Sequence, residues 1–165
     1  MRMPMPDPAL IERRADIVEA LRRIVPGEGV IVSEAERRVY ESDGLTAYRQ
    51  LPLVVVLPST VEQVAAVLRY CKEIGAKIVP RGAGTSLSGG ALPLADGVLL
   101  GMAKFNRILE IDYENRCAIV QPGVTNLAIS KAVEHAGFYY APDPSSQIAC
   151  TMAVMSRRTQ AGCTA

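Results

Sequence analysis

A glycine- and hydroxyl-rich stretch, residues 80–91, holds the residue types best suited to chemistry in this 165-residue chain. It reads Pro-Arg-Gly-Ala-Gly-Thr-Ser-Leu-Ser-Gly-Gly-Ala and contains no acid. Glycine lets a ligand approach the backbone closely, and successive free N–H groups form concavities that bind anions. The stretch therefore predicts a loop that cradles phosphate. The alternative is a flexible Gly/Ser linker, but apolar runs at 76–79 and 97–102 flank the loop and favour the cradle.

Two well-known phosphate-binding patterns do not fit this loop. Gly84 and Gly89 have the Walker A spacing, but Gly90 stands where that motif requires lysine. Gly82 and Gly84 begin a dinucleotide fingerprint, but Leu87 occupies the position of its third glycine. Nucleoside triphosphate hydrolysis and a Rossmann turn are therefore disfavoured. The loop is expected to bind phosphate by its own turns and not through a helix dipole.

The composition narrows the class of protein. Hydrophobic residues make up 49% of the chain, charged residues 21%, and the net charge is +1, which is typical of one globular domain. So balanced a charge gives no reason to expect nucleic acid as a partner. The four cysteines form no CxxC pair and His135 is the single histidine, so no metal site is expected. With no signal peptide and no apolar run long enough to span a bilayer, we expect a cytoplasmic location.

The elements that position the loop form a predicted βαβ unit. The apolar, β-branched run 53–57 indicates a buried strand. Ser59 and Glu62 match a capping box, and Gly75 matches the left-handed end of the helix that follows. The next strand, 77–79, leads directly into the loop.

The rest of the chain supplies helices and further strands. Residues 8–24 have the spacing of an amphipathic helix that ends before Pro26-Gly27. Strands are predicted at 97–102, 108–111 and 117–121, followed by a helix from 126 to 135 that Thr125 caps. A second loop rich in proline and hydroxyl residues follows at 139–146.

Three residue runs together resemble the FAD-linked oxidases of the vanillyl-alcohol-oxidase type. They are residues 80–91, Gln-Pro-Gly at 121–123, and Ala-Pro-Asp-Pro-Ser-Ser-Gln-Ile-Ala-Cys at 141–150. Within that family the FAD-binding subunits of bacterial glycolate oxidases are the most similar, over residues 8–151. The resemblance implies an α+β fold, the N-terminal part of a PCMH-type FAD-binding domain. A βαβ unit would precede a mixed or antiparallel sheet with flanking helices. The resemblance also divides the chain into a helical segment (1–47), an incomplete FAD-binding domain (48–151) and a tail (152–165).

The resemblance also implies which residues hold the cofactor. Some relatives carry a histidine in the Gly loop that bonds to the flavin, and Thr85 stands at that place, so the FAD is expected to be non-covalent. Arg81 could instead brace the loop, and Asp143 could instead cap a turn. No catalytic residue and no metal ligand is expected in this chain. The implied cofactor-binding residues are Arg81, Gly82, Ala83, Gly84, Thr85, Ser86, Ser88, Gly89 and Gly90 at the pyrophosphate, and Pro142, Asp143, Pro144, Ser145 and Ser146 at the flavin and ribityl chain.

The implied activity is FAD-dependent oxidation of a small 2-hydroxy acid, glycolate to glyoxylate. Electrons would pass to an iron–sulfur subunit among the other glycolate oxidase subunits, and any membrane association would be indirect, through those partners. Two alternatives stay open: a dehydrogenase of the same fold for D-lactate or another 2-hydroxy acid, and a non-catalytic phosphate-binding or interaction module. The family's substrate domain lies downstream of the matching residues, so this chain alone is expected to be inactive.

The last 14 residues depart from the family pattern, which continues Ile-Gly-Gly-Asn-Val-Ala-Glu-Asn-Ala-Gly-Gly-Val-His-Cys-Leu-Lys after Thr151. Codons for that continuation can be chosen so that losing the third base of the first codon yields residues 152–165, followed by a stop. We therefore expect the tail to be out of frame through a one-base deletion in the gene or in its sequencing. Resequencing the locus tests this expectation, and an intact frame without a family-like continuation would contradict it.

Overall fold

The computed structural model describes residues 3–142 and 147–155 and divides into two compact units. The N-terminal unit comprises residues 1–81 and 86–101, and the C-terminal unit comprises residues 82–85 and 102–165. The chain thus leaves the first unit at the start of the Gly loop, returns within it, and leaves again after residue 101. No described helix is long and apolar enough to cross a membrane.

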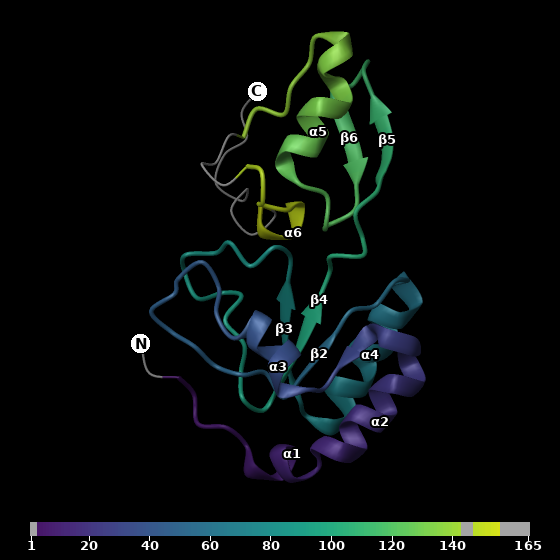
Figure 1. The fold of residues 1–165 in the computed structure, drawn as a ribbon. Helices are drawn as coiled ribbons and strands as arrows, with labels where there is room; N and C mark the ends of the chain where they lie inside the picture. The colour runs from purple at the N-terminus through teal and green to yellow at the C-terminus, as the bar shows by residue number, and fades with distance from the viewer. Residues whose placement is uncertain (1–2, 143–146, 156–165) are drawn as a thin grey trace. The chain divides into compact units, whose positions relative to one another are not determined.

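A four-stranded mixed sheet forms the centre of the N-terminal unit (Figure 1). Its strands are β1 (Val30–Ile31), β2 (Val54–Val56), β3 (Lys77–Arg81) and β4 (Gly97–Gly101), in the order β1-β2-β4-β3. Strand β4 runs parallel to β2 and β3 and lies between them, while β1 is antiparallel to β2. The two central strands, β2 and β4, are buried throughout, as expected for continuous apolar runs in a parallel sheet.

Helices α1 (Pro8–Glu12), α2 (Arg14–Ile24) and α4 (Val61–Ile74) supply the helical part of this unit. Helix α2 packs against α4, and both contact the sheet (Figure 1). The single helix predicted over 8–24 is divided at Arg13, where ψ rises to 9°, yet the N–H of Arg13 and that of Ile17 still donate within the ladder. The division is therefore a local bend. Shorter elements are η1 (Gly27–Gly29), α3 (Glu34–Arg37) and η2 (Arg38–Tyr40).

Helix α4 is capped one residue later than the sequence pattern predicted. Thr60 is the N-cap, with its hydroxyl accepting from the Gln63 N–H at 3.2 Å. Gln63 Oε1 in turn accepts from the Ser59 N–H at 2.8 Å. The pattern of a hydroxyl residue followed three places later by Glu or Gln occurs twice here, and the prediction chose the wrong copy. Gly75 does end the helix in the left-handed conformation, with φ 74°.

We predict that two described cysteines differ sharply in reactivity. Cys71 is buried on α4, and burial raises the pKa of its thiol to about 11, whereas Cys117 is exposed. Because the thiolate is the reacting form, Cys117 should be alkylated by iodoacetamide at pH 8 well before Cys71. Peptide mass spectrometry of the native chain measures this. Equal labelling of Cys71 and Cys117 would show that the α4 core opens readily, and urea-unfolded chain provides the full-labelling control.

The C-terminal unit contains a hairpin and a helix (Figure 1). Strands β5 (Ile108–Asp112) and β6 (Cys117–Val120) pair antiparallel, and α5 (Asn126–Val133) follows, capped by the Thr125 hydroxyl as predicted. The 3-10 turn η3 (Glu134–Ala136) replaces the predicted last turn of that helix. The short helix α6 (Met152–Met155) ends the described chain, so most of the predicted out-of-frame tail lies outside the described residues.

Candidate cofactor site

Arg81, the last residue of β3, is held by the N-terminal unit. Its Nη1 donates to the Tyr40 carbonyl at 3.0 Å, and its guanidinium carbon lies 5.7 Å from the centre of the Tyr40 ring. Burial lowers the pKa of Arg81, and the nearby Asp43 carboxylate opposes that shift. Asp43 is itself buried, with Oδ1 accepting from the Leu45 N–H at 3.0 Å. These contacts support the bracing role of Arg81, and contact with a ligand stays a prediction.

Replacing Arg81 should therefore destabilise the N-terminal unit. Arg81→Ala removes the hydrogen bond to Tyr40 and leaves the buried Asp43 carboxylate without its neighbouring cation, at a cost of about 1.5–3 kcal/mol. Urea unfolding measures the change. Adding Asp43→Asn should recover part of the loss, because it removes the uncompensated charge. An unchanged unfolding free energy in Arg81→Ala would show that the arginine does not brace the loop.

The next four residues, 82–85, belong to the C-terminal unit, and Thr151 holds Ala83 among them. The Ala83 N–H donates to the Thr151 hydroxyl oxygen at 3.1 Å. A Cβ placed on Gly82 would lie only 2.2 Å from that same oxygen, so only glycine allows the backbone to pass so close. Gly84 follows with φ 76°, a left-handed conformation that glycine adopts without strain.

Gly84 and Thr85 provide donors without protein partners. Their N–H groups have no acceptor in the part of the chain that the structure describes. The Thr85 hydroxyl is buried and likewise has no partner among those residues. Unpaired buried polar groups are costly, which makes this a site where a ligand oxygen would be stabilising. The predicted phosphate cradle thus fits the donors of this short segment.

The remainder of the Gly loop returns to the N-terminal unit and folds on itself. The Ser86 hydroxyl accepts from the Ser88 N–H at 3.3 Å, and the Gly89 carbonyl accepts from the Leu92 N–H at 3.2 Å. Gly89 has φ 72°. These turns need no helix, in line with the exclusion of a Rossmann loop. The cofactor contacts of Ser86, Ser88, Gly89 and Gly90 stay predictions.

An open cavity of about 440 Å³ lies beside the first part of the loop, within the C-terminal unit. Its volume falls within the usual range of small-molecule sites. None of the described residues that line it is charged, so it suits the uncharged part of a ligand, with hydrogen bonds from backbone groups and a few side chains. The lining residues are Gly82, Ala83, Ala103, Asn106, Ile108, Gly123, Val124, Thr125, Ala128 and Thr151.

The second predicted loop is anchored to the start of α5. The Asn126 side chain is buried, and its amide donates to the Pro142 carbonyl at 2.5 Å. The Asn126 N–H donates to the Cys150 carbonyl at 3.0 Å, and the Leu127 N–H to the Gln147 carbonyl at 3.2 Å. Pro142 is therefore placed close to the cavity-lining helix. The other predicted flavin-side residues, Asp143, Pro144, Ser145 and Ser146, lie outside the described residues.

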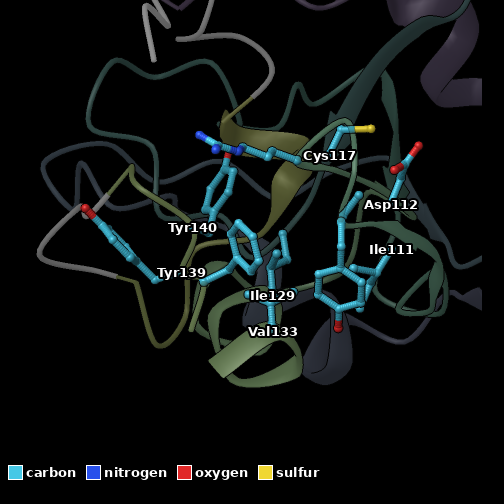
Figure 2. Close-up of a pocket in the computed structure, with 11 residues that line it drawn as sticks. Ile111, Asp112, Cys117, Ile129, Val133, Tyr139 and Tyr140 are labelled. Carbon is cyan, nitrogen blue, oxygen red and sulfur yellow. The ribbon is translucent and has the colours of Figure 1, made fainter. Parts of the chain in front are cut away.

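A second, smaller cavity of about 90 Å³ lies between α5 and the hairpin (Figure 2). Figure 2 shows Ile129 and Val133 on the helix, with Tyr139 and Tyr140 to one side and Ile111 of β5 to the other. Its walls are mostly apolar, and its volume is far below that of a dinucleotide site. It is best explained as a packing gap beneath the helix.

Comparisons with known proteins indicate the family of this chain. The family described as "FAD binding domain" matches residues 52–159. The chain belongs to this FAD-binding domain family. It is 56% identical over 139 residues to glycolate oxidase subunit GlcD of Escherichia coli (strain K12), covering 84% of this chain and 28% of that one. It is 32% identical to D-lactate dehydrogenase of Anaerostipes hadrus, covering 90% of this chain and 33% of that one.

A solved structure supports the same assignment. The 4-ethylphenol oxidase of Gulosibacter chungangensis superimposes with a TM-score of 0.71 at 28% identity, over 81% of this chain and 27% of that one. The predicted α+β fold and the membership of the FAD-binding family are confirmed, and FAD is the family's cofactor. The chain spans less than a third of the length of GlcD.

Sequence reasoning missed two residues that shape the site, Tyr40 and Thr151. Tyr40 is 41 residues from Arg81 and Thr151 is 68 residues from Ala83 in the chain. No sequence pattern around Tyr40 indicates that it contacts Arg81. Thr151 was placed at the last position of the family resemblance, but its hydroxyl carried no predicted role. Asn126 was predicted as the first residue of a helix, with no role in anchoring the second loop.

Proposed function

We propose that this chain forms part of the FAD-binding domain of an oxidoreductase that converts glycolate to glyoxylate. The unpaired N–H groups of Gly84 and Thr85, beside the buried Thr85 hydroxyl, carry the cofactor assignment. Bound FAD would accept the hydride equivalent from the 2-hydroxy acid. The chain's own residues would hold the pyrophosphate and the uncharged part of the cofactor. The flavin would be non-covalent, because threonine at position 85 cannot form the histidine link.

The 56% identity to GlcD, against 32% to a D-lactate dehydrogenase, favours glycolate over D-lactate as substrate. It also supports assembly with the other subunits of a glycolate oxidase. Among these we propose an iron–sulfur subunit as electron acceptor, with indirect membrane association. Membership of the FAD-binding family argues against the non-catalytic alternative. Substrate choice is tested on the full-length gene product that resequencing of the locus defines, by comparing kcat/KM for glycolate, D-lactate and D-2-hydroxyglutarate.

A chimera tests the cofactor assignment directly. Residues 1–151 of this chain are joined to the remaining part of E. coli GlcD, in place of the matching GlcD residues. We expect the purified chimera to show a flavin absorbance band and glycolate-dependent dye reduction, and the 165-residue chain alone to show no activity. The flavin should be released on acid precipitation, because it is non-covalent. A soluble, folded chimera without flavin would contradict the proposal.

A further inference from the structure

The side chain of Thr151 is the one described side chain that binds a backbone group of residues 82–85. Its hydroxyl oxygen accepts from the Ala83 N–H at 3.1 Å across 68 residues of sequence. Thr151 is only 7% exposed. A buried hydroxyl that satisfies a backbone donor fixes that donor's direction, because an unsatisfied group there would be costly. The contact therefore constrains where the Gly loop runs.

Thr151 is itself held from both sides along the backbone. It forms an antiparallel bridge with Thr125. The Met152 N–H donates to the Val124 carbonyl at 3.0 Å, and the Asn126 N–H donates to the Cys150 carbonyl at 3.0 Å. The hydroxyl is thus presented to the loop by a segment fixed against the start of α5. A rigid partner of this kind can orient a glycine-rich segment that has little conformational preference of its own.

The hydrogen bond also divides the donors of the loop into two groups. The Ala83 N–H is occupied by Thr151, whereas the N–H groups of Gly84 and Thr85 have no acceptor in the described structure. We propose that Thr151 is a positioning residue: by holding Ala83, it directs the next two N–H groups toward the cofactor phosphate. This inference rests on the proposed function, since it assigns those two groups to FAD.

Amide exchange tests the positioning contact without any cofactor. The full chain is labelled with ¹⁵N, and the exchange rate of the Ala83 amide is measured by NMR in Thr151→Val and Thr151→Ser variants. Valine keeps the shape but lacks the hydroxyl, so Ala83 exchange should rise about fivefold. Serine keeps the hydroxyl and should restore the slow rate. Thr60→Val, which removes a hydroxyl cap in the other unit, is the matched control and should leave Ala83 unchanged.

Titration with FAD then tests the cofactor role on the same samples. In the unsubstituted chain and in Thr151→Ser, FAD should shift the amide signals of Gly84 and Thr85. In Thr151→Val the FAD concentration needed for the same shift should rise about tenfold. Unchanged Ala83 exchange in Thr151→Val would overturn the contact. Faster exchange with unaltered FAD response would overturn the positioning role. The absence of any FAD response in the unsubstituted chain would count against the proposed function, and the exchange result would still decide the contact.

Discussion

Gly82→Ala is expected to destabilise the C-terminal unit by about 1–3 kcal/mol, because the new methyl group has no room. Its Cβ would lie 2.2 Å from the Thr151 hydroxyl oxygen and 3.0 Å from the Ala153 Cβ. Thr151 is short, β-branched and buried, so it cannot rotate away as a long side chain would. The substitution should therefore displace the loop and break the Ala83 hydrogen bond as well. Urea unfolding, together with Ala83 amide exchange, measures both effects.

A double-mutant cycle distinguishes this clash with Thr151 from a loss of stability that alanine at position 82 would cause for other reasons. Thr151→Ala removes the oxygen that the new methyl group meets, so the double variant should be more stable than the sum of the two single changes predicts, by about 0.5–3 kcal/mol. Gly137→Ala is the control in the same unit. It has φ 78° and open space around its Cβ, so it loses stability through backbone strain alone and Thr151→Ala should not rescue it. Simple additivity at Gly82 and Thr151 would contradict the packing argument.

The parts of the fold that the sequence predicted well are those set by neighbouring residues. The buried run before Pro58 became β2, and the hydroxyl residues 59 and 60 offered a helix start that was right to within one position. The two strands predicted at 108–111 and 117–121 pair across a tight turn, where Arg116 adopts φ 54° and the Asn115 N–H donates to Asp112. Local chemistry of this kind is visible in a window of a few residues.

The parts that could not be predicted depend on contacts between distant segments. Nothing in residues 97–101 indicates that β4 lies between β2 and β3 and not at the edge of the sheet. Likewise, the glycines at 82 and 84 predicted a close approach to the backbone, but not that a threonine 68 residues away would be the group that approaches. The composition of the loop and its resemblance to the family were enough to identify it. Which of its N–H groups is bound by Thr151, and which have no partner among the described residues, could be learned only from the fold.

Gly123→Ala is expected to have the largest effect, a loss of at least about 3 kcal/mol that unfolds the C-terminal unit. The new Cβ would lie 2.6 Å from the Met102 carbonyl oxygen and 2.7 Å from that of Phe105. These are backbone atoms, and they cannot rotate out of the way. The Gly123 N–H also donates to the Phe105 carbonyl at 2.7 Å, and the Phe105 N–H to the Met102 carbonyl at 3.0 Å, so the clash falls on a hydrogen-bonded turn. Hydrogen exchange should show lost protection over 108–133 and retained protection over 54–74.

Gly101→Ala is the informative comparison, because its new methyl group would approach a neighbouring atom even more closely than the methyl group at position 123 would. There the Cβ would lie 2.4 Å from Leu57 Cδ2, the far end of a side chain that can change rotamer. We expect a loss of no more than about 1–2 kcal/mol, even though the distance is shorter than either of the two carbonyl distances at Gly123. Equal losses at the two positions would contradict this reasoning. The difference follows from which atom must move, since a rotating methyl group leaves the chain in place, whereas moving the Phe105 carbonyl alters the turn that joins β4 to β5.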